Sequence, residues 1–176
     1  MGQDIDGEAA IDWSGYAVSL NTSGTIVAIG AIYNDGTYVN RYQTGTDAGH
    51  VRVYQYNGSQ WIQLGADIEG VAQYTNAGDS VSLSGSGQLV AIGAPAYIPP
   101  GSPFGQYSYG HVRIFYYNGS QWNEVSSNIV GEGSWHYFGY AVSLSRDGTT
   151  LAAGSERAGR LGFNDSGIIK VYKLSN

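Results

Sequence analysis

Three histidines are the first candidates for acid–base or metal chemistry. His50 and His111 both lie in a Gly-His-Val-Arg stretch, and a third copy of that stretch has Ile168 in place of histidine. A catalytic or metal-binding imidazole needs a specific set of partners, whereas a position that also takes isoleucine is typical of packing. We therefore expect no catalytic or ligating role for His50, His111 or His136.

The acidic residues are the second set of candidates. Two pairs of acidic residues hold matching positions in an internal repeat: Asp4 and Asp6, and Asp67 and Glu69. This recurrence indicates a shared turn or strand-edge role, because the carboxylate pair of a glycosidase occupies unique positions that face each other. The chain lacks nucleophile-elbow, zinc-protease and phosphate-loop motifs. It also has no cysteine, which excludes cysteine-ligated zinc and iron–sulfur sites. We expect no enzyme, no metal and no cofactor.

Four Asn-x-Ser/Thr sequences are candidate glycosylation sites, and all of them fall in predicted turns. The asparagines are Asn21, Asn57, Asn118 and Asn164. For Asn57 and Asn118 a second interpretation is open, because Asn-Gly suits a tight turn with or without a sugar. We expect at least two of the four to carry glycan if the protein is secreted from a eukaryotic cell.

Aromatic side chains gather in two kinds of predicted loop, and both kinds should emerge on one face of the molecule. Tyrosine and tryptophan offer stiff, amphipathic contact area for proteins or sugars; alternatively, these rings pack on one another and close the rim. Trp61 and Trp122, at the start of two strands, are expected to be structural. The candidate contact residues are Trp13, Tyr33, Tyr38, Tyr42, Tyr74, Tyr97, Phe104, Tyr107, Tyr109, Trp135 and Tyr137.

Composition narrows the function classes further. Eight basic and 14 acidic residues give a net charge of −6, which argues against nucleic-acid binding, because phosphates require a basic patch. No apolar run approaches the ~18 residues of a membrane helix, so we expect no membrane insertion. The N-terminus has neither a basic start nor an apolar core, so we expect no signal peptide in this segment.

The elements that position these residues follow from an internal repeat. Ala17-Val18-Ser19-Leu20 returns as Ser80-Val81-Ser82-Leu83 and as Ala141-Val142-Ser143-Leu144, at steps of 63 and 61 residues. Each copy holds four short extended runs, the first copy at 16–20, 25–31, 50–56 and 60–68. Asn57-Gly58 and Asn118-Gly119 separate the last two runs and predict type I′ hairpins. The sequence therefore predicts an all-β protein of three four-stranded antiparallel units, at 1–65, 66–126 and 127–176.

These units resemble the FG-GAP repeat, which forms the blades of the integrin α-chain propeller and of many bacterial and algal surface proteins. The resemblance rests on Phe138-Gly139-Tyr140-Ala141-Val142-Ser143 and Gly93-Ala94-Pro95, with degenerate copies elsewhere. It implies β-propeller-like blades and an extracellular or cell-surface location. Spacing alone leaves a radial propeller and a linear stack both open.

The resemblance also implies a place for calcium, in the loop between the first two strands of each blade. Calcium needs several oxygen ligands close together, and the family's ligand positions here hold a single carboxylate, Asp147. We expect plain polar turns instead, closed by Gly24, Gly87 and Gly148. The twelve positions hold Ser19, Asn21, Ser23, Val27, Ser82, Ser84, Ser86, Val90, Ser143, Ser145, Asp147 and Leu151.

The strands that are incomplete at the two ends of the repeat are relevant to assembly. The third copy stops before its fourth strand, and residues 2–7 match only the tail of a fourth strand. Three blades cannot close a propeller, so we expect head-to-tail association with copies of itself or with further repeats of the same chain. The expected function is a non-enzymatic extracellular structural or adhesive module that forms a larger propeller or a filament, with glycans or surface proteins as further partners. The alternative is a lectin that uses the aromatic face.

Overall fold

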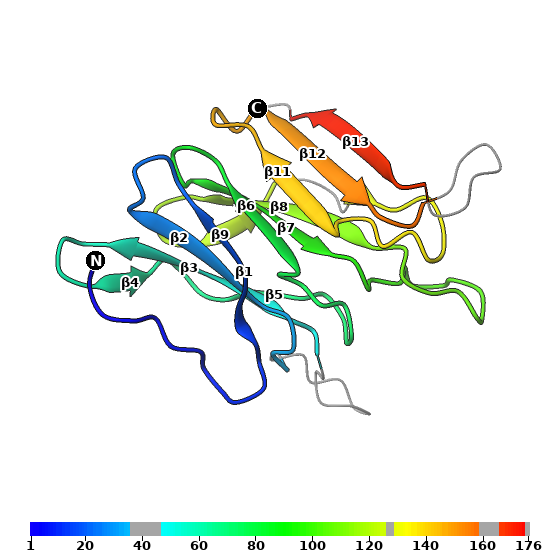
Figure 1. The fold of residues 1–176 in the computed structure, drawn as a ribbon, viewed down its shortest axis with the longest axis horizontal. Coiled ribbons are helices and arrows are strands. Elements are labelled where there is room, and N and C mark those ends of the chain that lie inside the picture. The colour runs from blue at the N-terminus through cyan, green and yellow to red at the C-terminus, as the bar shows by residue number, and fades with distance from the viewer. Residues whose placement is uncertain (36–46, 126–128, 159–165, 175–176) are drawn as a thin grey trace.

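The computed structural model describes residues 1–35, 47–125, 129–158 and 166–174, and within these ranges the chain forms strands and turns without an α-helix. The strands build three antiparallel sheets that follow one another along the chain (Figure 1). The predicted all-β class is confirmed.

The first sheet has the order β1-β2-β3-β4, and β5 pairs with the same edge of β3 as β4 does. Together β4 and β5 form the fourth strand predicted over 60–68, interrupted between them. The bounds are Ser14–Leu20 for β1, Ile26–Ala31 for β2, His50–Tyr56 for β3, Trp61–Gln63 for β4 and Ile68–Glu69 for β5.

The second sheet repeats this arrangement, and the described part of the third consists of three strands, β11-β12-β13. The second sheet contains β6 (Ser80–Leu83), β7 (Leu89–Ala94), β8 (His111–Tyr117), β9 (Trp122–Glu124) and β10 (Ile129–Val130). The third contains β11 (Ala141–Leu144), β12 (Thr150–Ser155) and β13 (Ile168–Lys173).

The hairpin between β3 and β4 forms where Asn57-Gly58 predicts it, but its turn is not type I′. Gly58 has a φ of 102°, whereas Asn57 is not among the residues with positive φ. Instead, the Asn57 side-chain oxygen accepts hydrogen bonds from the amides of Ser59 and Gln60, at 2.9 and 3.0 Å. The predicted turn type was wrong because the asparagine closes the loop through its side chain, as an Asx turn does.

The core lies between the sheets, and the second sheet is covered on both faces. Val90 and Ile92 of β7 belong to a cluster shared with the first sheet, while Ala91 belongs to a cluster shared with the third. All three are at most 3% exposed. When successive residues of a strand are buried on opposite faces of the sheet, every position is apolar and the sequence shows no alternation. This explains the Leu-Val-Ala-Ile-Gly-Ala sequence of β7.

A pair of glycines brings successive sheets together, and we call each such contact a glycine joint. Gly78, in the segment leading into β6, has a φ of 93°, and its carbonyl presses on Gly30 of β2 so closely that a Cβ on Gly30 would overlap it. Gly139, with a φ of 91°, meets Gly93 of β7 in the same way. These positions require glycine because no side chain fits between the two backbones.

Two tryptophans tie the sheets together at their outer edges. The Trp122 indole nitrogen donates to the carbonyl of Leu64, which follows the fourth strand of the previous sheet, at 2.7 Å. The Trp61 indole donates to the carbonyl of Met1 at 3.0 Å. The N-terminal residues therefore lie against the first sheet as the tail of a fourth strand would, which accounts for the sequence match between 2–7 and that tail.

Candidate functional site

The two kinds of aromatic-bearing loop lie against each other, at one end of the sheets. The loop between β7 and β8 accepts hydrogen bonds from the segment leading into the third sheet: the amides of Trp135 and Tyr137 donate to the carbonyls of Tyr107 and Ser108, at 2.8 and 3.0 Å. The loop after β2 makes the corresponding contact, from the Asn76 amide to the Asp47 carbonyl. We call this end the aromatic loop face.

The segments that lead into the sheets hold non-glycine residues in the left-handed region. Such a conformation costs roughly 1–2 kcal/mol for a residue with a side chain, and it recurs at the same two positions in all three repeats. This backbone turns several large side chains outward: Ile11, Trp13, Tyr74 and Trp135 are at least half exposed. The positive φ values are 79° for Ile11, 55° for Trp13, 55° for Tyr74, 55° for Asn76, 66° for Trp135 and 54° for Tyr137.

Two ring clusters stand on the aromatic loop face. In the first, the Trp13 and Tyr33 rings meet edge-on, with centroids 4.7 Å apart. In the second, the Tyr107 and Trp135 centroids are 4.6 Å apart, and Trp135 also touches Tyr137 at 6.3 Å. Both interpretations of the aromatic residues therefore apply in part, since the rings contact one another and still expose one side to solvent.

The other predicted contact residues are placed differently. Tyr97 does not belong to the exposed face: it is 7% exposed and stacks on the ring of His111, itself buried on β8, with the two ring centroids 4.0 Å apart. Phe104 is fully exposed, and the Tyr109 hydroxyl donates to Gln106 at 3.1 Å. Tyr38 and Tyr42 lie outside the described residues.

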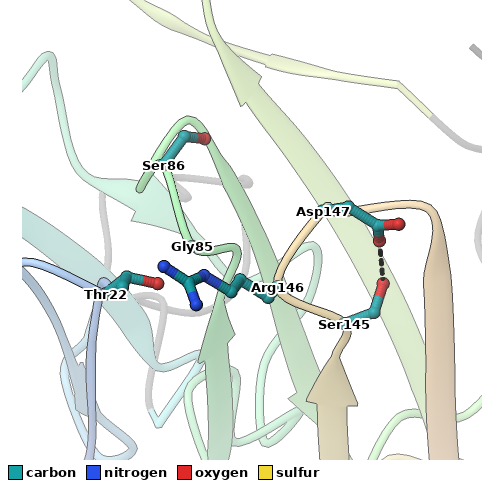
Figure 2. A pocket seen from close by; sticks show the side chains of 6 residues that line it. All are labelled: Thr22, Gly85, Ser86, Ser145, Arg146 and Asp147. Carbon is teal, nitrogen blue, oxygen red and sulfur yellow. Dashed lines mark hydrogen bonds between the residues drawn. The ribbon is translucent and has the colours of Figure 1, made fainter.

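A hollow of about 650 Å³ lies where the β1–β2, β6–β7 and β11–β12 turns converge (Figure 2). The turns are linked by their backbones, since the Thr22 amide donates to Gly85 and the Gly85 amide to Arg146. Figure 2 shows the Arg146 side chain extending between the turns toward Thr22. The remaining lining residues are Ser86, Ser145 and Asp147.

These turns are the place where the family resemblance implies calcium, and their oxygens already serve the backbone. The Asn21 side-chain oxygen accepts the amides of Thr25 and Ile26, at 2.9 and 3.0 Å. The Asp147 carboxylate accepts the Ser145 hydroxyl at 2.6 Å and the Thr149 amide at 3.0 Å. These hydrogen bonds lower the pKa of Asp147 to about 2. The arrangement is that of a side-chain-capped turn.

One cluster brings acidic residues and a histidine within metal-ligand distances, namely Glu8, His50 and Asp67. The Arg52 guanidinium stands among them and donates to Glu8 at 2.6 Å and to Asp67 at 2.7 and 2.9 Å. Burial favours the neutral acid, but the hydrogen bonds from Arg52 and Gln63 lower the pKa of Asp67 overall. An arginine therefore already supplies the positive charge of this cluster.

The four glycosylation candidates differ in exposure. Asn21 is 8% exposed, and its side-chain oxygen caps its own turn. Asn57 and Asn118 lie on exposed turns, where their side-chain oxygens cap the following amides. Asn164 lies outside the described residues. Glycan at Asn57 and Asn118 stays a prediction.

Two apolar sheet faces remain open at the ends of the three-sheet array. On the outer face of the first sheet, Val18 and Leu20 are 64% and 59% exposed, whereas Val81 and Leu83, at the same positions of the second sheet, are 9% and 6% exposed. We call Val18, Leu20, Val27 and Ile29 the first-sheet outer face. The opposite end is formed by Ala141, Ser143, Ala152 and Gly154, which we call the third-sheet outer face.

Comparison with known protein families and with curated proteins found no match for this chain. Among the described residues, no helix is long and apolar enough to span a membrane.

Proposed function

We propose that the chain is a non-enzymatic structural and adhesive module of the FG-GAP type, whose sheets are propeller blades that assemble head-to-tail outside the cell. The radial arrangement is supported by the position of the contacts between sheets. These contacts involve mainly the first strands: β1 against β6, and β6 against β11. Blades of a propeller also meet around a central axis.

The open first-sheet outer face carries the proposal. In the second sheet the corresponding residues are buried against the first sheet: Val90 and Ile92, the counterparts of Val27 and Ile29, are at most 3% exposed. Fully covering an exposed Val, Leu or Ile side chain is worth about 1.5–3 kcal/mol, so Val18 and Leu20, which are mostly exposed, are together worth about 3–6 kcal/mol at most in gross transfer free energy. Association that covers this face therefore has a strong driving force.

The adhesive part of the proposal rests on the aromatic loop face. Rigid rings that the backbone holds outward lose little conformational entropy when they bind a protein or a glycan. The non-enzymatic part rests on two of the acidic residues. Asp67 is committed to Arg52 and Asp147 to its own turn, so neither is free to act as a general base.

Multi-angle light scattering of the isolated chain at micromolar concentrations tests the proposal. We expect a mass of at least two chains that falls on dilution. A stable monomer at all concentrations, with a cooperative thermal transition, would contradict assembly as the function.

A lectin is the second candidate, and the Tyr107–Trp135 pair favours it, because two adjacent exposed rings can stack on a sugar ring. Screening the chain against a glycan array, beside a variant that carries Trp135→Ala and Tyr137→Ala, tests this reading. Tyr116→Ala is the matched control, since Tyr116 is 40% exposed on β8 and is not one of the candidate contact residues. Binding that the double variant loses and the control keeps would favour the lectin.

A further inference from the structure

The two open ends of the array carry the two halves of one more glycine joint. Gly15 is in phase with Gly78 and Gly139 and shares their conformation, with a φ of 92° beside 93° and 91°, yet a Cβ on Gly15 would meet nothing within 4 Å. Gly154 is in phase with Gly30 and Gly93, and the nearest atom to a Cβ there is the Ala141 Cβ, at 3.6 Å. Each half is therefore formed, and neither has a partner among the described residues.

The third-sheet outer face repeats the joining face of the first sheet at four positions on its first two strands, whereas Val51 of β3 corresponds to Ile169 of β13. Ala141 and Ser143 of β11 match Ala17 and Ser19 of β1, and Ala152 and Gly154 of β12 match Ala28 and Gly30 of β2. The register is also the same: Ala141 is opposite Gly154 as Ala17 is opposite Gly30. The face that receives the second sheet thus exists a second time, uncovered, at the far end.

The first-sheet outer face likewise repeats the face that the second sheet buries. Val18 is opposite Ile29 and Leu20 opposite Val27, as Val81 is opposite Ile92 and Leu83 opposite Val90. Joining the two open ends would therefore recreate the contact between the first and second sheets, with identical residues at eight positions. The surface that fits each open end is therefore one that this chain itself carries, and a second copy of the chain is the occupant that supplies it.

A hydrogen bond gives the joint its register. The Ser19 hydroxyl accepts the Leu83 amide at 3.0 Å, and the Ser82 hydroxyl accepts the Leu144 amide at 2.9 Å. The next members of this series are Ser143, which is exposed, and Leu20. A docked second copy would present its Leu20 amide to Ser143.

The third sheet also has room for the incoming backbone. A hollow of about 450 Å³ lies around Gly154 and Gly167. In the inner joints the corresponding space is filled: Phe138 bridges Gly110, the counterpart of Gly167, and Gly139 covers Gly93. Ser14-Gly15 of a second copy are the residues in phase with Phe138-Gly139, and they match the hollow in position.

We propose that the first sheet of one copy docks on the third sheet of a second copy, with Gly15 against Gly154 and Leu20 against Ser143. The inference rests on the proposed assembly function and specifies its interface. The contact joins two different surfaces, so it either closes a ring or extends as a filament.

Sedimentation velocity of two single variants tests this docking. Gly154→Ala adds a methyl group that fits the free chain but would overlap the Gly15 carbonyl of the second copy. Val18→Glu places a charge on the opposite end, at a side chain that is 64% exposed. We expect each variant to fold, shown by an unchanged circular dichroism spectrum, and to associate on the order of 100-fold more weakly than the unaltered chain.

An equimolar mixture of the two variants gives the sharpest readout. Each variant keeps one intact end, so we expect the mixture to form 1:1 dimers that grow no further. Phe104→Ala, which removes a larger exposed ring away from both ends, should associate like the unaltered chain.

The outcomes separate the two proposals. An unaltered chain that stays monomeric at micromolar concentrations overturns both the assembly function and the docking. Association that survives Gly154→Ala and Val18→Glu keeps the assembly function and overturns the docking. A mixture that stays monomeric, although the unaltered chain associates, overturns the head-to-tail pairing of these two ends.

Discussion

Replacing His111 by isoleucine should make the fold less sensitive to acid. His111 is 1% exposed, and its Nδ1 has no hydrogen-bond partner among the described residues. Burial, with a smaller contribution from the charge of Arg113, lowers the pKa of His111 from 6.5 to about 3. Ile168 holds the same repeat position, so isoleucine suits the surroundings.

The sign follows from the direction of the pKa shift. A histidine whose pKa is lower in the folded state binds its proton more readily when unfolded, so its contribution to stability is complete above pH 6.5 and declines as the pH falls from 6.5 toward 3. Each pH unit in that window is worth about 1.4 kcal/mol. At pH 5, His111 therefore costs the unaltered chain roughly 2 kcal/mol of unfolding free energy relative to pH 7.5.

Urea unfolding of the unaltered chain and of His111→Ile, at pH 7.5 and pH 5.0, measures this cost. The other titrating groups are present in both proteins, so they cancel in the comparison. We expect the two free energies to differ by about 1 kcal/mol or less at pH 7.5 and the variant to gain roughly 2 kcal/mol relative to the unaltered chain at pH 5.0. An equal acid-induced loss in both proteins would refute the reasoning and show that His111 is protonated in the fold.

Four further predictions concern the inner glycine joint, a partly buried acid, calcium and glycan. Gly93→Ala should lower the unfolding free energy by about 3 kcal/mol or more, because its Cβ would overlap the Gly139 carbonyl; a stable variant in urea would contradict the inner joint. Burial, and then Glu156, raise the pKa of Asp79 to about 6, so its stabilising effect is complete below pH 4 and declines as the pH rises through 6. Asp79→Asn should therefore raise the melting temperature at pH 7.5 and leave it unchanged near pH 3.5. The increase at pH 7.5 should be smaller than the full pKa shift implies, since Asp79 is only partly buried and solvent screens its charge. Millimolar calcium should leave the melting temperature unchanged, because a bound ion would raise it by mass action; an increase that a chelator reverses would refute this. Peptide mapping after deglycosylation in heavy water should mark Asn57 and Asn118 in protein secreted by a eukaryotic cell; unmodified residues at both positions would return them to plain turn residues.

Much of the strand pattern could be predicted from the repeat. The prediction of 50–56 matches β3 at both ends, because the repeated Gly-His-Val-Arg start and the Asn-Gly turn fix the limits of that strand. The run 60–68 was harder, since the sequence does not show that its pairing with β3 lapses between β4 and β5. In the first sheet the interruption contains Gly65, whose φ of 72° bends the chain there.

The glycine joints and the place of Tyr97 could not be predicted in the same way. Gly78 and Gly30 each recur at a fixed position of the repeat, and this recurrence is visible in the sequence. Their contact becomes evident only when two sheets are packed face to face. Tyr97 lies in a loop rich in exposed residues, and its burial depends on the His111 ring, which belongs to a strand 14 residues further along the chain. Contacts between elements, rather than local pattern, decide both features.

A structure of the associated protein, by cryo-electron microscopy or crystallography, tests the central claim most directly. We expect Gly15 of one copy to lie against Gly154 of the next, with Leu20 beside Ser143, superposing on the contact of Gly78 with Gly30. An assembly held together by other surfaces, with Gly15 and Gly154 both open to solvent, would contradict the account.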